Sequence, residues 1–240
     1  MLSNRLASVL NNCINSVQSS LPQACLLCGA RTLDGLLCAG CVTDLPALSR
    51  DCCPRCALPM SGAQAEGEVC GRCLRHPPAF ELTRAAFRYA FPLDALIRHC
   101  KYHGALELTD WFARVVERAV AELPRPDLLL PMPLHPARLA ERGFNQAAEI
   151  ARRLAPRLDI PWSATGARRL RDTPPQAGLD LRARRGNLRG AFRCDLDLSG
   201  RHVVLLDDVM TSGASLHELA QAARQAGAAR VSAWVVARAV

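Results

Sequence analysis

Two adjacent carboxylates, Asp207 and Asp208, directly follow an apolar run over residues 203–206. A continuous apolar run bounded by turn residues is typical of a strand buried on both faces of a parallel sheet. Hydroxyl side chains and one glycine occupy most of residues 211–215, and an alanine-rich pattern over residues 216–226 predicts a helix. The first N–H groups of a helix have no intrahelical partners, so this loop and helix start can bind a phosphate. Because two carboxylates would repel a bare phosphate, the pattern favours a ligand that also carries hydroxyl groups or a divalent cation, such as a sugar phosphate.

A second group of chemically active residues consists of cysteines. Eight of the twelve form four Cys-x-x-Cys pairs, all between residues 25 and 73. Thiolates separated by two residues in a tight turn can bind one Zn²⁺, and two such turns complete a tetrahedral site. We therefore expect up to two structural zinc ions. The predicted ligands are Cys25, Cys28, Cys38, Cys41, Cys53, Cys56, Cys70 and Cys73.

The cysteine pattern leaves the pairing open. Sequential pairing would build two ribbons, whereas an interleaved arrangement would let the first and third pairs share one ion. Cys52 adjoins Cys53 and could replace it as a ligand. A segment of about fifty residues with so little apolar content needs the metal for its folding free energy. Spacing that suits chelation, rather than the disulfides of an exported scaffold, predicts a reducing, cytoplasmic compartment.

Basic residues follow a second predicted strand, which lies within residues 127–133. Arg138 and Arg142 occupy an irregular segment between this strand and a helix predicted to end near Arg157. Guanidinium groups suit phosphate oxygens, and the carboxyl ends of parallel strands meet at one edge of a sheet, so both arginines are candidates to bind an anion. Residues 168–193 add eight arginines with little periodicity. They form either a solvated loop or a basic hood over pyrophosphate or nucleic acid.

Apolar periodicity and the cysteine pairs divide the chain into three parts. Residues 1–20 predict an amphipathic helix, packed on its own domain or, alternatively, used against a partner or a membrane surface. Residues 22–75 contain the zinc ribbons, and residues 82–240 form an α/β domain. In that domain we also expect strands over residues 84–90 and 229–239 and helices over residues 93–99 and 108–123.

The composition indicates the size of the core and the kinds of partner that the protein could bind. Half of the 240 residues are hydrophobic, which provides core for one large and one small domain. The chain has no continuous apolar run of about eighteen residues, so we expect no membrane insertion. Thirty Lys and Arg against 22 Asp and Glu give a formal net charge of +8. That charge favours anionic partners, whether nucleic acid or pyrophosphate-bearing metabolites.

The stretch over residues 203–215 resembles the phosphoribosyl pyrophosphate (PRPP) loop of the type I phosphoribosyltransferases, where a hydrophobic strand precedes two acidic residues and a Thr/Ser/Gly-rich loop. The resemblance implies that Asp207 and Asp208 are the catalytic pair and hold the ribose 2′- and 3′-hydroxyls. It also implies that the loop cradles the 5′-phosphate. The predicted PRPP- and phosphate-binding residues are Thr211, Ser212, Gly213, Ala214, Ser215, Lys101, Arg138 and Arg142.

A wider set of motifs resembles the ComF family, which joins a double zinc ribbon to a type I phosphoribosyltransferase-like domain. The match covers the chain from about residue 22 to its C-terminus. Besides the cysteine pairs and the loop, it rests on Phe87-Arg88-Tyr89, Lys101-Tyr102, Pro131-Met132-Pro133-Leu134-His135, Arg142-Gly143-Phe144-Asn145-Gln146, Thr173-Pro174-Pro175-Gln176 and Asn187-Leu188-Arg189-Gly190-Ala191-Phe192. Members often have Thr at Ser212 and Ser215, and serine keeps the hydroxyl. The resemblance implies a parallel-sheet fold behind a small zinc-ribbon domain, in a cytoplasmic bacterial protein similar to those linked to natural competence and incoming single-stranded DNA.

Two hypotheses about function follow. In the first, the protein is an enzyme that uses Mg²⁺ and PRPP to transfer the phosphoribosyl group to a nitrogen acceptor, releasing pyrophosphate. No residue stands out as a general base, which fits a reaction limited by stabilisation of the leaving group. In the second, the protein is a non-catalytic adaptor that binds single-stranded DNA, a helicase-like partner or other DNA-uptake proteins through the ribbons and basic loops. Aromatic residues make up only 5% of the chain and offer bases few stacking surfaces. The intact acidic pair favours retained PRPP binding.

Overall fold

The computed structural model describes residues 23–32, 35–49, 51–60, 67–172 and 189–240. The predicted N-terminal helix and most of the arginine-rich segment, with its Thr173–Gln176 motif, lie outside these ranges. The chain divides into two compact units, Met1–Leu45 and Pro46–Val240. Each unit is described by itself.

The first unit contains the first two cysteine pairs. Two short antiparallel strands, β1 (Gln23–Ala24) and β2 (Arg31–Thr32), flank the first pair. The helix α2 (Ala39–Thr43) begins after Cys38, and Cys41 lies within it. Such small elements bury little apolar surface, which agrees with a metal-dependent fold.

The second unit is built on a four-stranded parallel sheet with the strand order β3-β8-β7-β4. The strands are β3 (Leu82–Arg88), β4 (Leu128–Pro131), β7 (His202–Met210) and β8 (Arg230–Arg238). The remaining cysteine pairs precede the sheet in the same unit, where α3 (Gly71–Arg75) follows Cys70. The predicted parallel α/β fold is confirmed. The domain boundary predicted between residues 75 and 82 stays a prediction.

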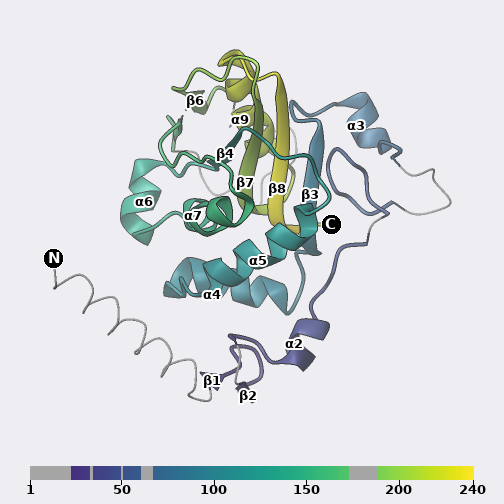
Figure 1. Cartoon of the computed structure of the whole chain (residues 1–240), viewed down its shortest axis with the longest axis vertical. Helices are drawn as coiled ribbons and strands as arrows, with labels where there is room; N and C mark the ends of the chain where they lie inside the picture. Colours follow the sequence, from purple (N-terminus) through teal and green to yellow (C-terminus); the bar gives the residue numbers. More distant parts are fainter. Residues whose placement is uncertain (1–22, 33–34, 50, 61–66, 173–188) are drawn as a thin grey trace. The chain divides into compact units, whose positions relative to one another are not determined.

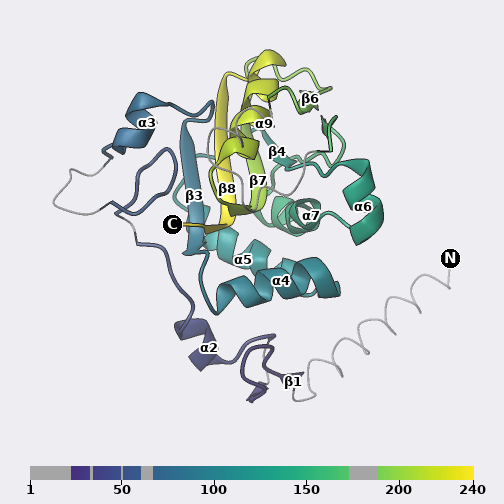
Figure 2. The ribbon, with the colours of Figure 1, turned by 180° about the vertical axis from the view of Figure 1, so that it is seen from behind.

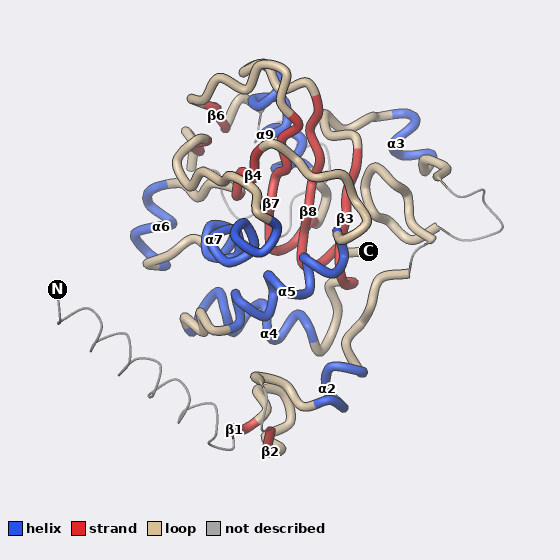
Figure 3. Tube along the Cα trace, viewed as in Figure 1, coloured by secondary structure: helices blue, strands red, loops and turns tan. Residues whose placement is uncertain are grey.

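Helices cover both faces of the sheet, as Figures 1 and 2 show from opposite sides, and Figure 3 separates the central strands from these helices by colour. On one face lies α9 (Ala214–Gln225), and on the other lie α5 (Leu108–Val120) and α7 (Gln146–Leu158). Side chains of a strand alternate between faces, so Val203 and Leu205 pack with the apolar side of α9. Val204 and Leu206 are equally buried, because both faces are covered.

Two helices flank the carboxyl ends of the strands. The helix α4 (Leu93–His103) continues past its predicted end at His99 and therefore includes Lys101. The prediction of an irregular segment around Arg138 is wrong, since Pro136–Arg142 form the helix α6. His135 caps it, because its Nδ1 accepts a hydrogen bond from Ala137 N at 3.3 Å, and a proline at the first helical position has no N–H to leave unpaired.

The arginine-rich segment begins and ends in a small antiparallel ribbon. Its strands are β5 (Ala167–Arg169) and β6 (Phe192–Cys194), and Arg168 pairs with Arg193. Among the described residues, no helix is both long and apolar enough to cross a membrane.

Candidate functional site

The carboxylate pair lies inside β7, because the strand runs to Met210 rather than ending at Leu206 as predicted. The neighbouring strand β4 ends earlier, where Pro131 pairs with Leu206. Beyond that point no strand of the described residues pairs with this edge of β7. Each carboxylate accepts a hydrogen bond from the next backbone N–H of the strand: Asp207 Oδ1 accepts from Asp208 N, and Asp208 Oδ1 accepts from Val209 N, both at 2.9 Å. Sheet register therefore places two acidic residues at an open strand edge.

The two carboxylates serve different faces of the sheet, since neighbouring side chains on a strand alternate. Asp208 is 7% exposed, and its Oδ2 lies 2.6 Å from Lys101 Nζ on α4. Burial lowers the pKa of Lys101, but Asp208 first and then Asp207 outweigh it, so the pKa lies above its usual value. Lys101 was predicted to bind PRPP. Here its ammonium is paired with Asp208, and this pairing favours the charged form of Lys101.

Asp207 faces the loop that follows the strand. It lines a small pocket together with Val209 and residues 210–216. Burial, followed by the nearby Asp208 carboxylate, raises the pKa of Asp207 to about 8. A carboxylate with such a pKa is costly to ionise in the ligand-free protein. A cation or a set of hydroxyl donors in the pocket would relieve that cost.

The loop turns sharply between β7 and α9. Gly213 caps α9 with φ = 79°, a conformation that side chains with a Cβ rarely adopt. A Cβ there would also lie 2.6 Å from Met210 Cε. Ser212 Oγ accepts a hydrogen bond from Ala214 N at 3.3 Å. The turn therefore opens the amino end of a three-turn helix toward the pocket that Asp207 lines.

The predicted basic residues gather near the pair. Arg142 Nη1 donates to Gln146 Oε1 at 2.8 Å, and its guanidinium lies 5.8 Å from the Tyr102 ring centroid. Arg142 also lies close enough to lower the pKa of Lys101. Arg138 Nε lies 3.3 Å from Asp172 Oδ1. The structure thus brings α4, α6 and the carboxyl end of β7 together.

Arg169 is a further basic residue that the sequence did not single out from the arginine-rich segment. Its guanidinium lies 5.6 Å from the centroid of the Phe192 ring. Burial first, and then Arg138, lower the pKa of Arg169, while Asp207 opposes the shift. These interactions link β5 electrostatically to both α6 and the carboxylate pair. Only the antiparallel pairing of β5 with β6 reveals this position.

The eight predicted metal ligands form two clusters. Within each, the sulfur atoms lie within 4.8 Å of one another, and the grouping is sequential rather than interleaved. The sulfur atoms of Cys28 and Cys38 are 3.6 Å apart, and those of Cys56 and Cys70 are 3.7 Å apart. Four Zn–S bonds of about 2.3 Å place tetrahedral ligands roughly 3.8 Å apart, whereas a disulfide needs about 2.05 Å. Both clusters fit structural zinc. Cys52 lies outside them, and its Sγ donates to Ser49 O at 3.0 Å.

Backbone amides support the thiolate form of one ligand in each cluster. Burial raises the pKa values of Cys25 and Cys53, but backbone N–H groups that point at each sulfur outweigh it, so both values fall below the ordinary one. For Cys53 one donor is Cys70 N, 3.4 Å from the sulfur. N–H groups that converge on sulfur favour the charged form that zinc requires.

A larger cleft of about 610 Å³ adjoins the loop on the side of the second cysteine cluster. Met210, Ser212, Gly213 and Ala214 line both this cleft and the small pocket, so residues 210–214 separate the two. Basic groups dominate the charged part of the lining. They are Arg72, Arg75, His76, Arg189 and His217, and among the described lining residues Glu218 is the one carboxylate.

Two protein families match separate parts of the chain. The double zinc ribbon domain family matches residues 17–74, and the phosphoribosyl transferase domain family matches residues 139–239. A purine phosphoribosyltransferase from Pyrococcus horikoshii Ot3 aligns with 54% of this chain and 81% of its own, at 15% identity and a TM-score of 0.34.

Two bacterial relatives match over most of their length. DNA utilization protein YhgH of Escherichia coli O157:H7 is 35% identical over 192 residues, which cover 78% of this chain and 83% of the relative. Competence protein F of Haemophilus influenzae is 31% identical over 212 residues, covering 85% and 90% respectively.

Proposed function

The chain belongs to the ComF family, and from this membership we propose that it binds PRPP with Mg²⁺ and transfers its phosphoribosyl group to a nitrogen acceptor. The observation that carries the proposal is the joint placement of three groups at one end of β7. Asp207 faces the pocket, Asp208 is paired with Lys101, and the loop opens the start of α9 toward Asp207. A ribose 5-phosphate needs hydroxyl acceptors and an anion site side by side.

Each part of the site has a distinct task in this proposal. Asp207 and Asp208 accept hydrogen bonds from the ribose hydroxyls, and the amides of residues 211–215 bind the 5′-phosphate. Arg138 and Arg142 bind pyrophosphate oxygens and stabilise the charge that develops as it leaves. Mg²⁺, when bound beside Asp207 and Asp208, would supply positive charge that offsets the charge developing on the leaving pyrophosphate. Acidic residues suit Mg²⁺, and the raised pKa of Asp207 is consistent with a carboxylate that a cation would stabilise.

Calorimetry with PRPP and Mg²⁺ tests binding directly. Asp207→Asn should weaken binding about ten- to a hundredfold, because a hydrogen bond to a charged acceptor contributes roughly 1.5–3 kcal/mol. Asp127→Asn is the matched control: Asp127 accepts from His202 N at 2.8 Å, at the opposite end of β7. A screen of bases for pyrophosphate release then tests turnover. Parent protein without affinity for PRPP, or two variants that bind equally, would refute the proposal.

A second candidate function is binding of single-stranded DNA in the cleft beside the second cysteine cluster. The observation that favours it is the basic lining, and the names of the two relatives concern DNA utilization and competence. Arg75→Ala and Arg189→Ala should weaken binding of an oligonucleotide and flatten its dependence on salt, because fewer counterions are released. Arg125, an exposed arginine paired with Asp159, provides the control. Equal binding by all three variants would exclude the cleft.

A further inference from the structure

Two arginines hold the backbone of the loop from the side of the second cysteine cluster. Arg238, at the end of β8, is 1% exposed; its Nη1 donates to Met210 O at 3.0 Å and also to Thr211 O. Arg72, on α3, donates from Nη2 to Ser212 O at 2.8 Å. Guanidinium groups therefore bind the carbonyls of three consecutive residues, Met210 at the end of β7 and the first two residues of the loop.

Holding these carbonyls also orients the opposite side of the loop. In a trans peptide the C=O of one residue and the N–H of the next point in opposite directions. Fixed carbonyls at residues 210–212 thus fix the N–H groups of residues 211–213 away from the arginines. Those N–H groups donate to no described residue. A row of oriented, unpaired N–H groups is a ready anion site, and orienting them in advance reduces the cost of binding.

Both arginines are connected to the second cysteine cluster. Arg72 lies between the ligands Cys70 and Cys73, and Arg238 Nε donates to Cys56 O at 2.7 Å. Cys56 and Cys73 belong to the same hydrophobic cluster as Met210 of the loop. A zinc ion with four thiolates carries net negative charge, which compensates a buried guanidinium that otherwise lacks a carboxylate partner among the described residues.

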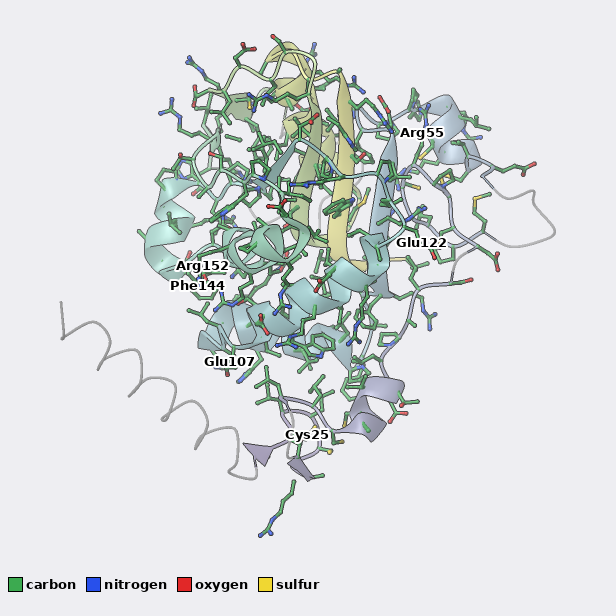
Figure 4. All side chains as sticks on the ribbon, viewed as in Figure 1. Cys25, Arg55, Glu107, Glu122, Phe144 and Arg152 are labelled. Carbon is green, nitrogen blue, oxygen red and sulfur yellow. The ribbon has the colours of Figure 1, made fainter. Side chains whose placement is uncertain are left out.

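The second ribbon is also attached to the sheet itself. Thr83 of β3 donates from its backbone N to Pro54 O at 2.8 Å, and from Oγ1 to Arg55 O at 2.5 Å. Arg55 lies beside β3 in Figure 4. The peptide between Cys53 and Cys56 is therefore bound to β3, while Cys56 O is bound to the end of β8. The turn from Cys53 to Cys56 is thus bound to two strands of the sheet, and Arg238 links it to the loop.

We propose that the second four-cysteine site positions Arg72 and Arg238, which hold the backbone of the loop over residues 211–215. The metal at this site thereby sets the affinity of the loop for a phosphate ester. The inference rests on the proposed function for the identity of the ligand. The coupling between metal site and loop stands on the hydrogen bonds alone. The first four-cysteine site has the same ligands but lies in the other compact unit, so it is the internal control.

The metal half of the test compares two matched serine variants. Cys38 and Cys70 each precede the short helix of their ribbon as its N-cap. Each variant, Cys38→Ser and Cys70→Ser, should lose one zinc per chain by elemental analysis. We expect Cys70→Ser to bind PRPP with Mg²⁺ at least about tenfold more weakly, and Cys38→Ser to stay within about twofold of the parent. Equal affinities in two variants that have each lost one zinc would overturn the proposal.

The arginine half leaves both metal sites intact. Arg72→Ala should keep two zinc ions, lower the ¹⁵N heteronuclear NOE of residues 211–213 without ligand, and weaken PRPP binding about tenfold. Arg55→Ala is the control, because Arg55 is also partly buried and lies between the other two ligands of the same site, Cys53 and Cys56. If Arg72→Ala leaves the loop as rigid as Arg55→Ala does, the coupling is absent. If the parent fails to bind PRPP, the proposed function falls, and the relaxation data still decide the coupling. Should Cys70→Ser not fold, the comparison of Arg72→Ala with Arg55→Ala decides alone.

Discussion

Replacing Asp208 with Asn should destabilise the ligand-free protein as well as weaken its affinity for PRPP. The Asp208 carboxylate is the nearest counter-charge of Lys101, with 2.6 Å between Oδ2 and Nζ. The amide of asparagine fills the same volume but carries no charge. The ammonium of Lys101 would then remain partly buried without the partner that holds its pKa above the usual value.

The burial of the pair sets the expected magnitude. Exposed ion pairs contribute at most about 1 kcal/mol, whereas removal of one partner from a buried pair costs about 3–5 kcal/mol. The Lys101 and Asp208 side chains are 23% and 10% exposed, which lies between these limits but nearer the buried one. We therefore expect Asp208→Asn to lower the free energy of unfolding by about 2–3 kcal/mol. For a chain of this size the Tm should fall by about 4–12 °C.

Thermal and urea unfolding measure the effect. The matched control is Asp94→Asn, because Asp94 pairs with Arg98 on the same helix at 3.0 Å, with an arginine that is 58% exposed. The control should cost no more than about 0.5 kcal/mol. A double-mutant cycle with Lys101→Met should give a coupling of about 2 kcal/mol. If Asp208→Asn costs no more than Asp94→Asn, or if the two changes in the cycle are additive, the pair does not stabilise the fold and the reasoning fails.

Three further predictions concern the metal, the loop and the pH dependence. Purified protein should contain two zinc ions per chain by elemental analysis, since both clusters have tetrahedral spacing; a metal-free folded protein would contradict this. Gly213→Val should weaken PRPP binding at least tenfold by calorimetry, because valine rarely adopts φ = 79°; unchanged affinity would show that the loop does not bind the phosphate. Asp207 has a pKa raised from 3.8 to about 8 in the folded state. Its contribution to stability is therefore full below about pH 4 and is lost as the pH rises to about 8. Between pH 5 and 8 the Tm of Asp207→Asn should fall less than the Tm of the parent protein. Parallel Tm profiles would show that the pKa of Asp207 is not raised.

The sequence alone determined the elements that have a clear local pattern of apolar residues or cysteines. The apolar run before Asp207 predicted a buried strand, and the alanine-rich pattern after Ser215 predicted α9, because both periodicities are local properties of the chain. The spacing of the cysteine pairs likewise predicted two four-cysteine clusters. Element ends were less well predicted: β7 continues past Leu206, since its pairing with β8 persists to Met210 and Arg238.

The tertiary structure decided how these parts act on one another. Asp207 and Asp208 are neighbours in sequence, yet the pleat of β7 gives one to the loop and pairs the other with α4. No local pattern states which helix supplies that partner, because Lys101 lies more than a hundred residues earlier in the chain. Sequence likewise indicates that Arg72 sits in a zinc knuckle and that Arg238 ends a strand. Only the packing of that knuckle against the sheet brings both guanidinium groups to the carbonyls of one loop, since hydrogen bonds across such separations depend on the assembled fold.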